Sequence, residues 1–206
     1  MQNNLSARRR ALMETTVGET WDFQWDYSKG KLEDQPGWEK VVSGSASSTM
    51  ASDGERFSTA GSHSDYYIVR PQSSSPLRTM TGGLGVMEVT FFGNIATGIN
   101  ENFEIRVVES ASKRIGTAIT GTQGRLNITV QDRNETIICP FESNVVYTVR
   151  VEMKASGADV YVNGVIKLSD FSLSASLYGA YNGVLAIGLG NNSLTLKALK
   201  IKAGRT

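Results

Sequence analysis

The chain of 206 residues has little of what many catalytic and cross-linked proteins depend on, because it contains one cysteine, Cys139, and one histidine, His63. A single cysteine excludes an intramolecular disulfide and zinc sites built from several thiolates. Cys139 lies in the apolar stretch 136–140, so we interpret it as a buried structural thiol. His63 lies in the polar stretch 61–64, which favours a surface histidine over a catalytic base.

The chain also lacks an excess of charge of one sign and a long apolar run. Lys and Arg number 21 against 20 Asp and Glu, which argues against nucleic-acid partners and against attachment to anionic membranes by charge. No run of about 18 apolar residues is present to form a transmembrane helix. Residues 1–6 lack the apolar core of a secretory signal peptide, so we expect synthesis in the cytoplasm.

Helical periodicity is nearly absent, and patterns of period two take its place. Aromatic and polar residues alternate at 21–26, and such alternation returns along most of the chain between turns rich in Gly, Asn and Pro. We predict strands at 21–26, 66–69, 86–92, 103–107, 125–131, 145–153, 159–162, 165–168, 183–189 and 194–201. About a dozen short strands predict one all-β domain, a two-sheet antiparallel jelly-roll sandwich.

Local details sharpen this prediction. The dipeptide Asn163-Gly164 predicts a tight hairpin. In the last strand the apolar parity slips between Leu196 and Leu199, which predicts a β-bulge near Ala198. We place three tryptophans in the core, namely Trp21, Trp25 and Trp38.

The start of the chain differs from the rest. Residues 5–14 combine helix formers with an N-cap candidate, Ser6, and three consecutive arginines at 8–10. Isolated helices of fewer than about 12–15 residues are marginal in water. We therefore expect a short helical or frayed arm over 1–16, followed by the jelly-roll domain over 17–206.

Three features resemble the concanavalin A-like lectin/glucanase superfamily, in its laminin-G-like branch. They are the aromatic residues at 21–23 and 36–38, the run from Tyr147 to the Asn163-Gly164 turn, and the ending at 185–201. The resemblance spans about residues 20–203 and implies a jelly roll whose final strand returns beside the first. Calcium is common in that superfamily. We expect no cofactor here, with bound calcium as the alternative, and its candidate ligands are Asp22, Asp53 and Asp170.

The arm carries a second resemblance. Residues 5–13 are similar to the opening of tail or appendage proteins of phages and prophages of gut Firmicutes. This resemblance implies that residues 1–15 bind other virion proteins, and that the protein works in a virion or outside the cell after lysis. A solvated arm without a partner is the alternative.

The glycosidases of the resembled superfamily carry Glu-x-Asp-x-x-Glu or Glu-x-Asp-x-Glu on one strand. Here Glu104 is followed two positions later by Arg106. A regular strand would put Glu104 and Glu109 on opposite faces, whereas a retaining pair lies about 5–5.5 Å apart. No Gly-x-Ser-x-Gly elbow supports a serine triad with His63. We therefore predict a protein without catalytic activity.

Polar residues alternate with apolar ones along the central predicted strands, and on one face they would form a shelf that hydrogen-bonds sugar hydroxyls. Tyrosines in the loop at 178–183 would add stacking platforms. The candidate carbohydrate-binding residues are Glu104, Arg106, Arg125, Asn127, Gln131, Arg150, Tyr178 and Tyr181. An ordinary solvated sheet face is the alternative.

These observations lead to one hypothesis and two alternatives. The hypothesis is a non-catalytic, lectin-like module that recognises a surface glycan as part of a phage or prophage particle. The first alternative is a structural virion decoration protein without a ligand, whose sandwich edges contact neighbouring subunits or further copies of the chain. The second is a divergent polysaccharide hydrolase or lyase.

Overall fold

A computed structural model describes most of the chain: residues 19–58, 66–72, 74–75, 77, 85–94, 102–110, 113–120, 125–130, 135–153, 158–171, 183–188 and 193–202. The predicted arm over 1–16 lies outside these residues. The described part forms 15 strands and two short 3₁₀ helices, η1 (Tyr27–Lys29) and η2 (Leu32–Asp34). Neither described helix is long and apolar enough to span a membrane.

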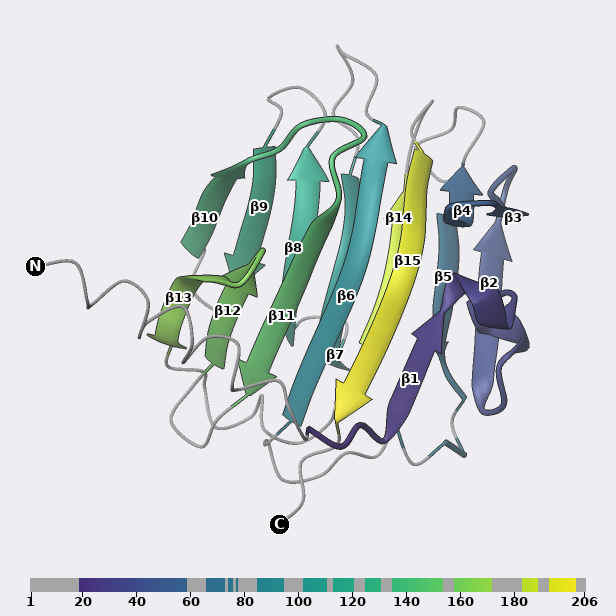
Figure 1. Ribbon diagram of the computed structural model, residues 1–206, viewed down its shortest axis with the longest axis horizontal. Coiled ribbons are helices and arrows are strands. Elements are labelled where there is room, and N and C mark those ends of the chain that lie inside the picture. The colour runs from purple at the N-terminus through teal and green to yellow at the C-terminus, as the bar shows by residue number, and fades with distance from the viewer. Residues whose placement is uncertain are drawn as a thin grey trace, which may run out of the picture.

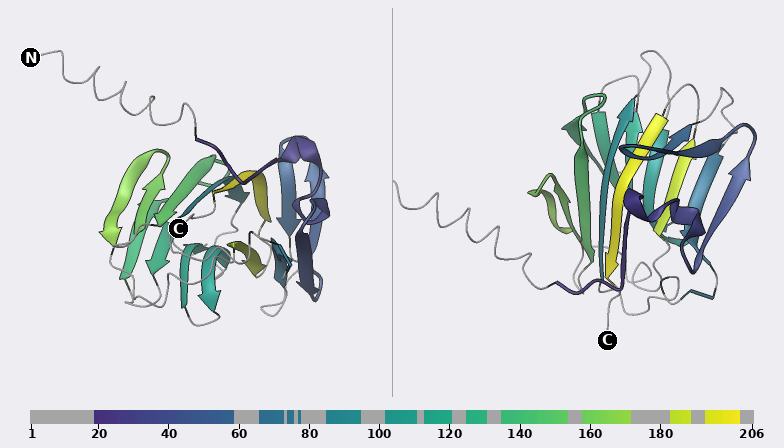
Figure 2. Two further views of the ribbon diagram at one scale, coloured as in Figure 1. Left: turned by 90° about the horizontal axis from the view of Figure 1, so that it is seen from below. Right: turned by 45° about the vertical axis from the view of Figure 1, so that its right-hand side comes forward.

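The strands form two antiparallel sheets that lie one on the other as two layers (Figure 1, Figure 2). Sheet A has the order β13 (Val165–Phe171), β12 (Ala158–Val162), β11 (Tyr147–Met153), β6 (Gly85–Asn94), β15 (Ser193–Lys202), β4 (Gly54–Ser58) and β3 (Ser47–Ala51), and β1 (Phe23–Asp26) also pairs with β15. Sheet B has the order β10 (Glu135–Pro140), β9 (Arg125–Val130), β8 (Lys113–Thr120), β7 (Asn102–Ser110), β14 (Gly183–Gly188), β5 (Tyr66–Pro71) and β2 (Trp38–Ser43). The predicted two-sheet antiparallel jelly roll is confirmed.

The last strand, β15, lies inside sheet A and explains the slip in apolar parity. Its register against β6 shifts between Leu196 and Ala198, so the strand contains one extra residue there. Leu196 and Leu199 are therefore both buried although they are three positions apart. The bulge predicted near Ala198 is confirmed, and so is the return of the final strand beside the first, because Ile201 pairs with Phe23.

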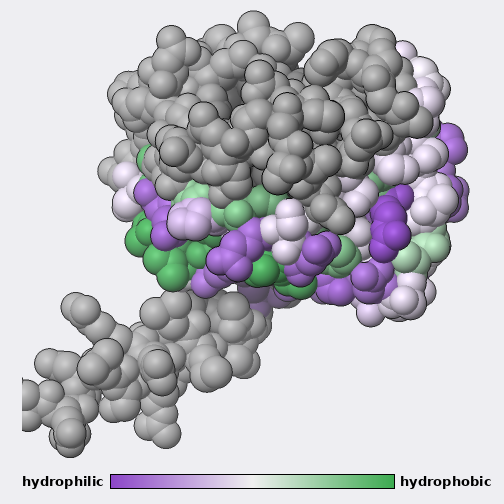
Figure 3. Space-filling model, turned by 90° about the horizontal axis from the view of Figure 1, so that it is seen from above, coloured by the Kyte–Doolittle hydropathy of each residue, from purple (hydrophilic) through white to green (hydrophobic). Residues whose placement is uncertain are grey.

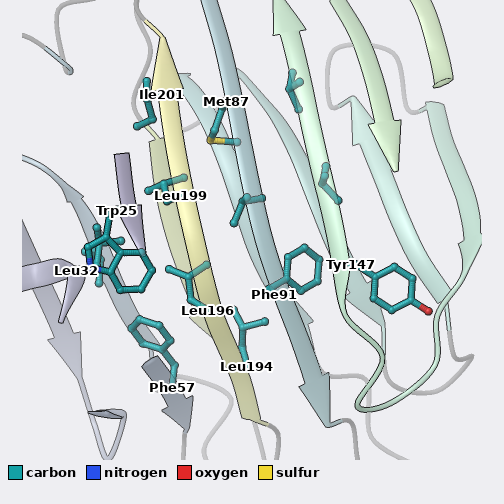
Figure 4. Close-up of a cluster of buried hydrophobic side chains, with 14 of the residues drawn as sticks. Trp25, Leu32, Phe57, Met87, Phe91, Tyr147, Leu194, Leu196, Leu199 and Ile201 are labelled. Atoms are coloured by element: carbon teal, nitrogen blue, oxygen red, sulfur yellow. The ribbon is translucent and has the colours of Figure 1, made fainter. Parts of the chain in front are cut away.

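The core lies between the two sheets and is filled by alternate residues of both. Phe57 on β4 is fully buried, and its ring meets the Tyr67 ring of β5 edge to face with the centroids 5.4 Å apart. Phe57 and Phe91 lie on either side of β15 (Figure 4). Aromatic contacts across the interior therefore join sheet A to sheet B.

The three tryptophans do not share one environment. Trp25 and Trp38 are 1% and 3% exposed, as predicted for core residues. Trp21 is partly exposed, and its ring lies 5.4 Å from Arg150 Cζ and 5.4 Å from Lys200 Nζ on the outside of sheet A. The prediction of a buried Trp21 is wrong because β1 begins only at Phe23, after a bend in the backbone.

Apolar side chains also reach the surface, mainly beside the β12–β13 hairpin. Val165 and Ile166 are 55% and 45% exposed there. Figure 3 shows hydrophobic residues gathered on that side of the described surface, with hydrophilic residues among them. The described surface is thus mixed in character.

The hairpin turns at Asn163 and Gly164, whose φ angles of 50° and 75° suit a two-residue primed turn. The Asn163 Oδ1 accepts from the Thr148 N–H at 2.8 Å. We expect Asn163→Ala to lower the free energy of unfolding by about 1–2 kcal/mol, because alanine is strained at positive φ and this bond is lost. Denaturant unfolding measures the loss. Asn163→Gly, which suits the backbone, should recover part of it, and an equal loss for both variants would contradict the backbone contribution.

Candidate functional site

Sheet B has one buried face and one outer face, and strand alternation assigns residues to each. Tyr67 and Val69 of β5 and Cys139 of β10 are buried in the core. Burial raises the pKa of the Cys139 thiol, which agrees with the structural role predicted for it. Positions of the opposite parity on these strands, and those paired with them, therefore belong to the outer face.

One row of paired positions crosses all seven strands of sheet B on that outer face. From β2 to β10 it runs through Val41, Ile68, Ala186, Glu104, Ala118, Asn127 and Ile138. Glu104 lies on the central strand of the sheet, and Asn127 lies two strands away, at about 10 Å. The two positions are separated by alanine alone.

The neighbouring rows bring two arginine positions to the same face. Arg106 on β7 pairs with Gly116 on β8, and Arg125 on β9 pairs with Thr120 on β8. Four of the predicted residues, Glu104, Arg106, Arg125 and Asn127, therefore occupy adjoining rows of one face, which we call the polar face of sheet B.

Small residues separate these polar positions. Ala186 and Ala118 flank Glu104, and Gly116 lies beside Arg106. Glycine inside a strand often marks a place where a ligand approaches the sheet closely. The polar face therefore combines hydrogen-bonding residue types with room above the central strands.

Arg150 does not belong to the polar face. It lies on β11 in sheet A, where Nη1 and Nη2 donate to the two carboxylate oxygens of Glu19 at 3.0 and 3.1 Å and Nε donates to Glu152 at 2.6 Å. Burial acts to lower the pKa of Arg150, but these hydrogen bonds outweigh it and raise the pKa above its ordinary value. The expectation that Arg150 shares a face with Glu104 is wrong, because alternation along a strand does not reveal which sheet the strand joins.

The remaining predicted residues are not brought to the polar face by any described contact. Gln131, Tyr178 and Tyr181 lie outside the described residues. Of the residues considered for calcium, Asp53 lies in the β3–β4 turn and Asp170 on β13, at opposite edges of sheet A. Within the described ranges, no group of three or more side chains suited to a metal ion comes together.

The parity argument against a glycosidase pair does not apply to β7. The register between β7 and β8 shifts between Val108 and Ser110, next to Glu109, so β7 is not a regular strand there. A bulge of this kind changes which face the following residues reach, and bulges are frequent beside active sites. The sequence argument against catalysis on this strand therefore depends on Arg106, which stands where the resembled glycosidases have Asp.

A buried carboxylate that the sequence analysis did not single out lies beneath η2. Glu55 is fully buried, and its oxygens accept from the Leu32 N–H at 2.8 Å and the Ser48 hydroxyl at 2.5 Å. Glu33 lies nearby, accepts from the Tyr67 hydroxyl and forms a 2.7 Å ion pair with Lys40. These contacts fasten η2 to β4 and to the core, which is a structural role. Only the side-chain environment, and no sequence motif, identifies it.

Burial raises the pKa of Glu55 above the 4.5 of an exposed glutamate, and its hydrogen bonds offset only part of that shift. Above pH 4.5 the unfolded chain loses this proton while the folded chain keeps it, so the free energy of unfolding falls as pH rises towards the folded pKa. Glu55→Gln keeps the shape and cannot ionise. We expect its stability relative to the native protein to increase between pH 4.5 and neutral pH, as measured by urea unfolding. A difference that is constant with pH would contradict the assignment.

No protein-family model matches the sequence, and no curated protein matches it. Solved structures resemble the fold. The apo Crh5 transglycosylase aligns with a TM-score of 0.66 at 14% identity, over 89% of this chain and 84% of that one. A structure from work on endo-acting O-glycanases of the human gut microbiota, which initiate mucin breakdown, aligns at 0.64 with 10% identity, over 90% and 100% of the two chains.

A third similar structure is not presented as an enzyme. It belongs to botulinum neurotoxin type C, whose cell entry depends on interaction with two ganglioside molecules, and it aligns at 0.54 with 12% identity, over 82% of this chain and 44% of that one. At these identities the three likenesses show the jelly-roll fold. The fold is one that carbohydrate-active enzymes and glycan-binding domains share.

Proposed function

We propose that this protein is a lectin-like, non-catalytic carbohydrate-binding protein and that the polar face of sheet B binds the glycan. The observation that carries the proposal is the strand register, which brings Glu104, Arg106, Arg125 and Asn127 to adjoining rows of one face. Carboxylate, guanidinium and amide groups supply both the acceptors and the donors that sugar hydroxyls need. The similar structures support a carbohydrate-related role.

We also propose, from the resemblance of residues 5–13 alone, that the arm attaches the protein to a phage or prophage particle. In that setting residues 1–15 bind another virion protein, and the jelly roll meets the glycan outside the cell. Deleting residues 1–15 should then abolish incorporation into particles while leaving the jelly roll folded. Normal incorporation of the truncated protein would overturn this part of the proposal.

Glycan binding is tested with an array of bacterial wall and mucin-type glycans, followed by titration calorimetry on any glycan bound. We expect Glu104→Ala and Asn127→Ala each to weaken binding about tenfold or more, since a hydrogen bond to a charged group contributes about 1.5–3 kcal/mol and a neutral one somewhat less. Glu142→Ala is the matched control, because Glu142 is exposed in the β10–β11 loop, away from sheet B's central strands.

Three outcomes would contradict the proposal. Silence of the intact protein across the array would remove glycan binding, and unchanged affinity of both variants would remove the polar face as its site. Release of reducing ends from a polysaccharide by the native protein, abolished in Glu104→Gln, would replace binding by hydrolysis. Circular dichroism of each variant checks that the sandwich remains folded.

A further inference from the structure

Residues 19–22, which precede β1, lie across the outer face of sheet A and are fastened there. The Arg150 guanidinium binds both carboxylate oxygens of Glu19, at 3.0 and 3.1 Å. The Trp21 ring lies beside that guanidinium, and the Asp22 N–H donates to the Ile201 carbonyl at 3.0 Å. A two-pronged ion pair, a ring contact and a backbone hydrogen bond thus hold one short segment. We call this group of contacts the clasp.

The sheet holds Arg150 in place for this contact. Its Nε donates to Glu152 on the same strand at 2.6 Å, and its Nη1 lies 3.5 Å from Glu88 on β6. Lys202 adds a second cation 3.6 Å from Glu19. A guanidinium oriented in this way loses little freedom when it binds a further carboxylate, and two parallel bonds fix the direction from which that carboxylate arrives.

The clasp is also shielded from solvent. The side chains of Arg150 and Glu19 are only 19% and 13% exposed. Burial acts to raise the pKa of Glu19, but the hydrogen bond and the charge of Arg150 outweigh it and hold the pKa below its ordinary value. Partly buried ion pairs are screened by salt much less than exposed ones. The clasp should therefore stay closed at physiological ionic strength and neutral pH.

The position of the clasp decides where the N-terminal arm leaves the domain. Glu19 is bound on the outside of sheet A, and Figure 2 shows the start of the described chain on that side of the sandwich. The polar face is the outer face of sheet B, so the full thickness of two packed sheets separates it from the clasp.

We propose that the clasp makes the arm emerge over sheet A, so that a partner holding residues 1–15 lies over sheet A while the polar face is turned away from it. The partner it fits is an acidic protein surface, because the arm carries three consecutive arginines at 8–10 and Lys202 is exposed beside the clasp. This inference rests on the proposed function for the roles of the polar face and the arm.

A spin label near the clasp tests the direction of the arm. A nitroxide on Thr16→Cys, in a Cys139→Ser background, is three residues from Glu19, and so its backbone lies within about 11 Å of that residue. In the nuclear magnetic resonance spectrum we expect broadened amide signals for Glu88 and Arg150 on sheet A. We expect unchanged signals for Val41 and Ile68, which lie on the outer side of sheet B. Broadening of the sheet B signals would overturn the proposal.

Glu19→Gln tests the clasp itself, with Glu142→Gln as the matched control. We expect Glu19→Gln to lose the broadening at Glu88 and Arg150 and to make Trp21 fluorescence more accessible to acrylamide, while the buried Trp25 keeps its protection. The control should behave as the native protein does. Unchanged broadening in Glu19→Gln would overturn the clasp.

Two further measurements separate this proposal from the proposed function. Glycan binding should be equal in the native protein and in Glu19→Gln, and its absence from both would count against the polar face without touching the spin-label result. Polyglutamate, used as a probe of an acidic partner, should shift signals on sheet A in the full chain but not after residues 8–10 are changed to alanine. Equal shifts in both proteins would contradict an acidic partner for the arm.

Discussion

Replacing Phe57 with alanine is expected to lower the free energy of unfolding by about 3–5 kcal/mol, the range for a large buried aromatic residue. Phe57 is fully buried on β4, and its ring reaches across the interior to Tyr67 on β5. Both neighbours belong to hydrogen-bonded sheets, which limits how far the structure can collapse into the space left by the ring. Urea unfolding followed by tryptophan fluorescence measures the change.

Two variants show whether the loss comes from the interior. Phe57→Leu leaves a smaller cavity and should destabilise the protein less than Phe57→Ala. Ile166→Ala removes a side chain that is 45% exposed, and it should change stability by less than about 1 kcal/mol. A Phe57→Ala protein as stable as Ile166→Ala would contradict the packing of the two sheets described above.

Gly54→Ala is expected to cost about 3 kcal/mol, the upper end of the range for overpacking a rigid site. An added Cβ would lie 2.5 Å from Thr195 Cγ2 and 2.6 Å from the Leu196 carbonyl oxygen. That oxygen belongs to the backbone of β15, in the middle of sheet A, so it cannot move aside as a flexible side chain would. Thermal unfolding of the variant measures the cost.

Gly30→Ala is the matched control, because Gly30 has a φ of 82° and nothing lies within 4 Å of an added Cβ. It bears the strain of an alanine at positive φ without any clash, which is about 1–2 kcal/mol. The difference between the two variants therefore isolates the clash at β15. A Gly54→Ala protein no less stable than Gly30→Ala would show that β4 and β15 are not in close contact.

The sequence predicted strands best where apolar and polar residues alternate strongly. β7 and β9 follow this rule, and their predicted positions 103–107 and 125–131 agree closely with Asn102–Ser110 and Arg125–Val130. β8 was missed because Gly116 and Ala118 weaken the contrast between its two faces. β2 was missed because it is an edge strand on which Lys40 and Val42, of the inward parity, remain exposed.

The candidate site could be predicted only in part, for a related reason. Alternation correctly placed Glu104 and Arg106 on one face of one strand, since that depends only on local geometry. The separation of Arg150 from them depends on which strands pair across long stretches of sequence, and no local pattern records this. Trp21 and Glu55 show the same limit, because tertiary contacts alone decide their environments.

The outer edges of the two sheets have a consequence for how the domain behaves at high concentration. The register of β13 against β12 shifts twice, and β10 ends at Pro140, which has no N–H to offer a further strand. An uneven or proline-capped edge is a poor template for strand addition. Many copies can therefore be crowded on one support without their sheets fusing into aggregates.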